Sequence, residues 1–202
     1  MGGGVFLGGG GGGAPPDSDW LIAGGSLPPG SPTDLYARLA TALPDADRKL
    51  VVDTSGAALD ALIGTPCALV KPNLAELAGV IGRRLGTLSE VIDAAGKLRR
   101  GGWRSVLVSM GPRGAVLLAE DVCYGPAPMT EVRNTVGAGD ALLAGFLSAG
   151  GRGAAALAEG LAWARAAVQS TDTLAQAVTD GDRRAVQVTA DPGQHRRVGG
   201  LS

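Results

Sequence analysis

The sequence predicts an α/β fold with a mainly parallel sheet that is covered by helices on both faces. Short, continuous apolar runs, which suit buried strands, alternate along the chain with segments long enough for helices. The runs are followed by turns rich in glycine and small polar residues, as expected where a buried strand ends. At 202 residues the chain is long enough for one domain with a sizeable core.

Strands and helices are expected to alternate from Trp20 to Arg100. The first helix is expected to open with Ser31 as its N-cap and Pro32 in its first turn. A later helix is expected to open at Asn73. The strands expected in this region are residues 20–23, 49–53 and 68–70, and the helices are residues 31–43, 56–62, 73–80 and 89–100.

The second half of the chain is expected to add a strand, a hairpin and two long helices. The hairpin would turn at Glu120 and Asp121. After Ser170 the chain becomes polar, with one weak strand expected at residues 185–188. The other elements expected here are a strand at 105–108, the hairpin strands at 114–119 and 122–124, and helices at 139–149 and 153–170.

Residues 1–18 are a glycine-rich, low-complexity segment that we expect to contribute nothing to the fold. Such a tract cannot bury enough apolar surface to order itself, and Val5-Phe6-Leu7 is too short for the apolar core of a signal peptide. The segment would be a linker or the ragged start of a truncated chain. The folded part is therefore expected to span residues 19–202.

Composition excludes several classes of protein. The formal charge of −1 and the pI of about 5.8 argue against a nucleic-acid binder that works through bulk positive charge. No apolar run is long enough for a membrane-spanning helix. Cys67 and Cys123 lie far apart, which favours two reduced thiols in a cytoplasmic protein. The single histidine, His195, lies beside two arginines near the C-terminus, which argues against a histidine-based site.

The segment from Asn134 to Asp140, Asn-Thr-Val-Gly-Ala-Gly-Asp, carries the strongest chemical signal. Gly137, Ala138 and Gly139 leave the backbone open at a helix start, where the N–H groups and the helix dipole favour an anion. The Asp140 carboxylate can accept a proton from a substrate hydroxyl while the N–H groups hold the charge of a phosphoryl group. The alternative is a glycine-rich helix start in which Asp140 only complements the dipole.

The segment from Ser109 to Gly114 follows a predicted strand. Gly111, Gly114 and the Ser109 hydroxyl can form a concave phosphate-binding turn. The alternative is an ordinary entry into the hairpin. No Gly-Lys-Ser/Thr follows, so the segment is not a Walker A loop.

The segment from Lys71 to Glu76 also follows a predicted strand. Asn73 and Glu76 share one helix face, so they could simply be an N-cap and its capping-box partner. The functional alternative places Glu76 near the hydrated Mg²⁺ that accompanies ATP, with Lys71 near the phosphates.

The turn from Gly25 to Gly30 follows the first predicted strand. It is either a rigid connector or, through Gly25 and Ser26, part of the wall around a phosphorylated sugar. Ligands of parallel sheets bind beyond the carboxyl ends of the strands, so we expect all four segments to meet at one edge.

Together, in this order, the four segments resemble the ribokinase-like, PfkB-type carbohydrate kinases. The stretch NTVGAGDALLAGFL, residues 134–147, matches the family's C-terminal signature throughout. Residues 25–30 and 71–77 look most like the branch that acts on fructose phosphates and tagatose 6-phosphate, with fructose 1-phosphate as the leading acceptor. The resemblance runs from about Trp20 to the C-terminus. It implies a three-layer α/β/α fold and transfer of the γ-phosphoryl group of ATP, with Mg²⁺, to a sugar phosphate.

The resemblance also implies a role for each matching residue. Asp140 would be the catalytic base, and the helix at 153–170 would flank the adenine. Asn73 and Glu76 match an Asn-x-x-Glu motif linked to Mg²⁺ and phosphate. The remaining implied positions are Gly137, Ala138 and Gly139 in the anion hole, Lys71, Ser109, Gly111, Gly114 and Asn134 along the ATP phosphates, and Gly25, Ser26 and Asp140 toward the sugar.

Full-length relatives carry an additional N-terminal portion that supplies further strands, a β-sheet lid and most sugar contacts. We expect this chain to lack them and to be the C-terminal ATP-binding and catalytic part, with a low or absent rate on sugar phosphates. The full-length form would be a homodimer, with no nucleic-acid or membrane partner. The alternatives are a nucleotide-binding module without sugar kinase activity and a kinase for another acceptor, such as a nucleoside.

Overall fold

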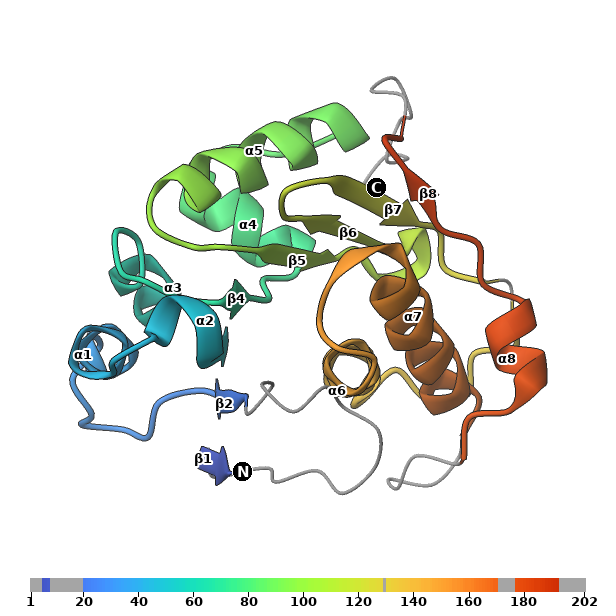
Figure 1. Cartoon of the computed structure of the whole chain (residues 1–202), viewed down its shortest axis with the longest axis horizontal. Coiled ribbons are helices and arrows are strands. Elements are labelled where there is room, and N and C mark those ends of the chain that lie inside the picture. The colour runs from blue at the N-terminus through green and yellow to red at the C-terminus, as the bar shows by residue number, and fades with distance from the viewer. Residues whose placement is uncertain (1–4, 8–19, 129, 171–176, 193–202) are drawn as a thin grey trace.

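The computed structural model describes residues 5–7, 20–128, 130–170 and 177–192 (Figure 1). They form an eight-stranded sheet in which the strands lie side by side in the order of the sequence, from β1 to β8. Helices cover both faces of this sheet, so the predicted three-layer α/β/α arrangement is confirmed.

The sheet has a parallel part and an antiparallel part. β2 (Leu21–Gly24), β3 (Leu50–Asp53), β4 (Leu69–Val70) and β5 (Val106–Ser109) pair in parallel. β7 runs in the same direction as these four, whereas β1, β6 and β8 run against them, which makes the sheet mainly parallel. The bounds of the antiparallel strands are β1 Val5–Leu7, β6 Ala115–Leu118, β7 Val122–Gly125 and β8 Thr189–Ala190.

The helices divide between the two faces of the sheet (Figure 1). α1 (Leu35–Ala42), α2 (Ala46–Lys49), α3 (Ala57–Ala61), α4 (Leu74–Ile81) and α5 (Leu88–Arg100) pack on one face. On the opposite face lie α6 and α7. The remaining bounds are α6 Ala138–Ser148, α7 Gly153–Gln169, α8 Asp180–Arg184 and the 3₁₀ turn η1 Gly111–Arg113.

Each face of the sheet has its own hydrophobic core, because successive strand residues point to opposite sides. In β5, Val106 and Val108 join the cluster beneath α1–α5, whereas Leu107 between them joins the cluster beneath α6 and α7. In β3, Val52 and Val51 divide in the same way. The strands are therefore apolar along their whole length, and their polar residues are confined to the ends.

Two predicted boundaries were wrong. The first helix begins at Leu35 after Asp34, and Ser31 is not its N-cap, because the Ser31 N–H donates to Pro28 O (3.1 Å) and extends the preceding turn. The strand expected at 185–188 is also absent from the described residues. A helix, α8, ends at Arg184 instead, and the strand that pairs with β7 forms later as β8.

The expectation that residues 1–18 contribute nothing to the fold was wrong at Val5–Leu7, which form β1 and pair antiparallel with β2. This is the one apolar run of the glycine-rich segment, and it pairs with a strand edge that would otherwise lack a partner. The rest of that segment lies outside the described residues, as does His195.

Candidate active site at the carboxyl edge of the sheet

The turns after the four parallel strands meet at one edge of the sheet, and three of them are segments that the sequence predicted there. β2 is followed by Gly25, β3 ends at Asp53, β4 is followed by Lys71 and β5 ends at Ser109. Since the strands are parallel and neighbouring, their carboxyl ends lie together, in the place where α/β sheets bind ligands.

An ion pair lies at the centre of this edge. The Lys71 Nζ lies 2.8 Å from Asp53 Oδ2, and the two side chains are only 7% and 22% exposed. Lys71 also reaches the start of α6, because a Cβ placed on Gly139 would lie 3.4 Å from its Nζ. The carboxyl ends of β3 and β4 are thereby joined to the helix that carries the glycine-rich signature.

The start of α6 is open. Its N-cap, Gly137, has a positive φ of 80° and no side chain that could cap the helix. Among the described residues, the N–H groups of Gly139 and Asp140 have no hydrogen-bond acceptor. Asp140 itself is exposed to solvent. This geometry leaves backbone donors, a nearby ammonium group and a carboxylate available to a ligand.

The segment before α6 is held by hydrogen bonds. Asn134 Oδ1 accepts from the Val136 N–H (2.9 Å), which forms a local turn. The N–H groups of Arg133 and Asn134 both point to Val168 O at the end of α7, at 2.8 and 3.2 Å. Asn134 therefore fixes the conformation of the chain just before α6, whether or not it also contacts phosphate.

The turn after β2 is fixed to the end of β3. The Gly25 N–H donates to Asp53 O (2.9 Å), and Thr54 Oγ1 donates to Gly25 O (3.1 Å). The buried Tyr36 hydroxyl also lies 3.1 Å from Gly25 O. Ser26 follows Gly25 and is exposed, so two of the three residues predicted to face the sugar lie in the turn that is bonded to the end of β3.

The predicted helix cap at Asn73 is confirmed. Asn73 Oδ1 accepts from the Glu76 N–H (2.9 Å), and Glu76 Oε2 accepts from the Asn73 N–H (2.8 Å), which forms a complete capping box. Asn73 also forms an isolated parallel bridge with Ser109, whose N–H donates to Pro72 O (3.1 Å). Two of the four predicted segments are thus in direct contact.

The residues present are compatible with a magnesium ion held mainly by phosphates. Within the described part of the chain, no group of three or more His, Cys, Asp or Glu side chains forms a metal cage. Glu76 Oε1 accepts no hydrogen bond there, so one carboxylate oxygen remains available. Mg²⁺ commonly binds proteins through one or two carboxylates together with substrate phosphates and water, which suits this arrangement.

The turn after β5 needs glycine for steric reasons. Gly114 has a φ of 91°, and a Cβ there would lie 1.9 Å from Gly125 O. Its N–H donates to Gly111 O (3.0 Å), and its carbonyl accepts from Met110 (2.8 Å). Gly111 and Gly114 therefore shape this turn, and they make no hydrogen bond to the ion pair.

Asp53 is the residue of this edge that sequence reasoning missed. Burial raises the pKa of its carboxyl group above the ordinary value; Lys71 opposes this rise, and the nearby negative charge of Asp140 adds to it. The available signal was its position, since it is the last residue of an apolar strand whose carboxyl end was expected to face the site.

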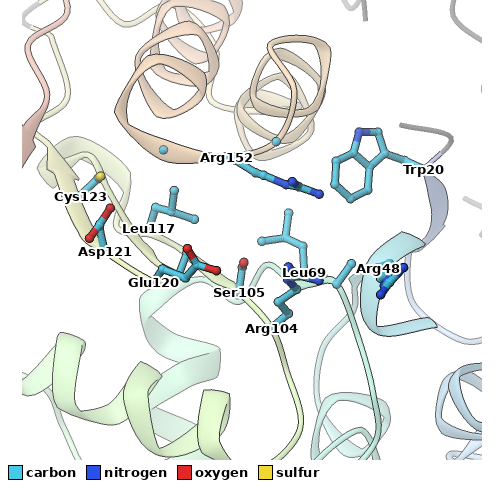
Figure 2. Close-up of a pocket in the computed structure, with 14 residues that line it drawn as sticks. Trp20, Arg48, Leu69, Arg104, Ser105, Leu117, Glu120, Asp121, Cys123 and Arg152 are labelled. Carbon is cyan, nitrogen blue, oxygen red and sulfur yellow. The ribbon is translucent and has the colours of Figure 1, made fainter. Parts of the chain in front are cut away.

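A cavity of about 300 Å³ lies at the opposite edge of the sheet (Figure 2). Several of its lining residues precede parallel strands: Trp20 precedes β2, Arg48 precedes β3 and Arg104 precedes β5. Arg152 points across the cavity in the direction of Trp20. None of the predicted site residues lines this cavity, and it is separate from the candidate site.

Comparison with known proteins finds a matching family model and similar curated relatives. Residues 17–180 match the model of the pfkB family carbohydrate kinases. A 1-phosphofructokinase of Rhodobacter capsulatus is 44% identical over 133 residues, which cover 65% of this chain and 42% of that protein. A 1-phosphofructokinase of Haloferax volcanii is 42% identical over 134 residues, which cover 66% of this chain and 43% of that protein. The matched part thus spans less than half the length of these curated relatives.

The fold is similar to a solved phosphofructokinase. The phosphofructokinase-2 of Escherichia coli, in complex with potassium, superposes with a TM-score of 0.70 and 29% identity, over 81% of this chain and 54% of that one. A tetrameric inhibited form of the same enzyme superposes with a TM-score of 0.68 and 28% identity, over 83% of this chain and 55% of that one. No helix among the described residues is long and apolar enough to cross a membrane.

Proposed function

This chain belongs to the pfkB family of carbohydrate kinases, and we propose that its carboxyl-edge site transfers the γ-phosphoryl group of ATP to a hydroxyl group of a sugar phosphate. The observation that carries the proposal is the open start of α6. Among the described residues, the Gly139 and Asp140 N–H groups there have no acceptor, the Lys71 ammonium group lies beside Gly139, and the same turn carries the Asp140 carboxylate. Phosphoryl transfer to an alcohol needs these three functions together.

In the proposed mechanism, Asp140 takes the proton from the acceptor hydroxyl. The backbone of Gly137, Ala138 and Gly139 holds the charge of the phosphoryl group in transfer, and the Ala138 N–H gives up its long bond to Thr135 O (3.4 Å) to do so. The Lys71 ammonium group beside Gly139 adds its positive charge. Magnesium, when bound near Glu76, would neutralise phosphate charge.

The other predicted positions surround this centre. We propose that Gly25 and Ser26 line the sugar side and that α7 flanks the adenine. The residues along the ATP phosphates would be Ser109, Gly111, Gly114 and Asn134, with Asn73 holding Glu76 in place through the capping box.

The acceptor we propose is fructose 1-phosphate, with fructose 1,6-bisphosphate as the product. The support is the name 1-phosphofructokinase, which belongs to two relatives that are 44% and 42% identical to this chain over the matched residues. Tagatose 6-phosphate and fructose 6-phosphate are the competing acceptors. Because the substrates are ATP and a phosphorylated sugar, we place the reaction in the cytoplasm, with the full-length form as a homodimer.

A second candidate function is nucleotide binding without sugar phosphorylation. The observation that favours it is that the features described at this edge, the open start of α6 and the Lys71 ammonium group, are all suited to phosphate. Such a module would bind a nucleotide at this edge without transferring its phosphoryl group to a sugar.

The test is ADP release by the purified chain with Mg-ATP and each of the three sugar phosphates, beside an Asp140→Asn variant. We expect slow sugar-dependent turnover, fastest with fructose 1-phosphate, that falls by a factor of about 10²–10⁴ in the variant. ATP affinity should stay within about threefold, because the base is not a phosphate ligand. ATP binding without turnover would favour the second candidate, and loss of ATP binding in Asp140→Asn would make Asp140 structural.

A further inference from the structure

We infer that Asp53 is a positioning residue, which holds the Lys71 ammonium group at the open start of α6 in readiness for a phosphoryl group. This inference rests on the proposed function and deepens it. Asp53 is not one of the residues that the sequence motifs identify. Its role follows from its contacts.

The first argument is burial. The Lys71 side chain is 7% exposed, and an ammonium group so far from water is stable only with an opposite charge beside it. Among the described residues, Asp53 provides the one ion pair that Lys71 makes, at 2.8 Å. The backbone of Lys71 is tied to the same strand, because its N–H donates to Val52 O (3.0 Å).

The second argument is direction. The ammonium group lies next to Gly139, in the first turn of α6, where the backbone N–H groups have no acceptor among the described residues. The ammonium group and these N–H groups both carry positive charge, so they attract an anion and repel each other. The negative charge of Asp53 therefore keeps the lysine in this place before a phosphate arrives.

The third argument is that Asp53 is itself rigidly held. Its carbonyl oxygen accepts from the Gly25 N–H (2.9 Å), and the Thr54 hydroxyl fixes the Gly25 carbonyl. Asp53 thus connects the turn proposed to face the sugar with the cation proposed to face the phosphate. A displaced Asp53 would move both groups relative to each other, which matters because small errors in position can cost about a hundredfold in rate.

The test is a double-mutant cycle with Asp53→Asn, Lys71→Met and the two together, using Asp34→Asn as the control. Asp34 pairs with Arg38 on the exposed surface, so its loss removes an ion pair that involves neither Asp53 nor Lys71. We measure kcat/KM, the affinity for a non-hydrolysable ATP analogue, the Mg²⁺ dependence and Tm.

If Asp53 acts through Lys71, Asp53→Asn lowers kcat/KM by about a hundredfold. The double variant is then no more than about twofold worse than Lys71→Met, because coupled residues do not act additively. Analogue affinity falls in Asp53→Asn, the Mg²⁺ dependence stays at the wild-type value, and Asp34→Asn behaves as the wild type.

The inference is overturned if the kcat/KM losses of the two single variants multiply in the double variant. It is also overturned if Asp53→Asn raises the Mg²⁺ requirement and the double variant shows the same increase relative to Lys71→Met. The second result would make Asp53 a metal ligand. If Asp53→Asn fails to fold because Lys71 is left unpaired, the comparison of the double variant with Lys71→Met still decides, since both variants lack the buried ammonium group. A wild-type chain that fails to bind the analogue overturns the proposed function and, with it, this inference. If the wild-type chain binds the analogue no more tightly than the Asp53→Asn variant, only the positioning role is overturned.

Discussion

Two helices, α4 and α6, begin at the same edge of the sheet and differ in how their first turns are satisfied. The start of α4 is closed, because Asn73 and Glu76 exchange hydrogen bonds with each other's backbone. The start of α6 is open, because its N-cap is Gly137 and no side chain caps it. N–H groups at a helix start destabilise the fold when they have no acceptor. An open start beside the Lys71 ammonium group is therefore suited to an anionic ligand.

This difference shows that similar motifs at a helix start can contribute to helix stability and to ligand binding to different degrees. Both starts combine small or polar residues with one carboxylate, and the sequence allowed either interpretation for each. The closed start secures α4 whether or not a metal ion binds Glu76. The open start contributes little to the stability of α6, and its value lies in what it can bind.

The largest effect is expected from partly closing the open start. Gly139→Ala places a methyl group in contact with Lys71 Nζ, at 3.4 Å, and so fills part of the space proposed for the phosphoryl group. The variant should lower kcat/KM by about a hundredfold. Stability should change by less than about 0.5 kcal/mol, because Gly139 lies at the fraying start of the helix. Steady-state kinetics and thermal melting provide the two measurements.

Gly79→Ala in α4 is the matched control. A Cβ at Gly79 meets nothing within 4 Å, so this variant should gain about 1 kcal/mol of helix stability and keep its activity. Equal activity of the two alanine variants would contradict the distinction between the two starts.

A smaller effect is expected from Glu76→Gln, which tests whether the closed start also serves the metal. Glutamine keeps an oxygen that accepts from the Asn73 N–H, so the free energy of unfolding should fall by less than about 1 kcal/mol. The loss of the carboxylate charge should raise the Mg²⁺ concentration for half-maximal activity by about tenfold or more. Titration of activity with Mg²⁺ measures this, and an unchanged midpoint removes Glu76 from the metal site.

The smallest effect is expected at a closed start outside the site. In α5, Thr87 and Glu90 form a second capping box, and the hydrogen bond from Arg83 is the largest cause that lowers the pKa of Glu90 to about 2 from an ordinary value of 4.5. The depressed pKa means that the Glu90 charge stabilises the fold above pH 4.5 and that this contribution is lost as the pH falls through about 2.

Glu90→Gln should therefore lower Tm by a few degrees at pH 7, with a difference from the wild type that shrinks steadily below pH 4.5. Activity and Mg²⁺ dependence should not change. The exposed Glu120→Gln in the turn between β6 and β7 serves as the control. A Tm difference that stays constant down to pH 2 would show that the charge of Glu90 contributes nothing.

The sequence predicted β2 to β7 and the long helices because apolar runs and helical spacing report burial directly. Helix starts were harder, because several nearby groups compete for the same backbone N–H. Ser31 had a good N-cap composition, but the chain uses its N–H to extend the turn from Pro28. The start of α8 could have been found, since Thr179 and Asp182 have the capping-box spacing and the structure pairs them.

The predicted site residues were found through their glycines and through their place after strands. Asp53 could not be distinguished in the same way, because one acidic residue after an apolar run is common at any strand end. Its distinguishing neighbours, Lys71 and Gly25, lie 18 and 28 residues away in the sequence. Only the parallel pairing of β2, β3 and β4 brings the three together.

The crowded backbone at Gly114 has a consequence for genetic variation. Every missense change of a glycine codon adds at least one side-chain carbon, and at this position that carbon would overlap the Gly125 carbonyl oxygen at 1.9 Å. In a library of random variants selected only for folded protein, position 114 should remain glycine, whereas position 139 should accept alanine. The frequencies of the surviving codons would then distinguish glycines that are needed for folding from glycines that are needed only for activity.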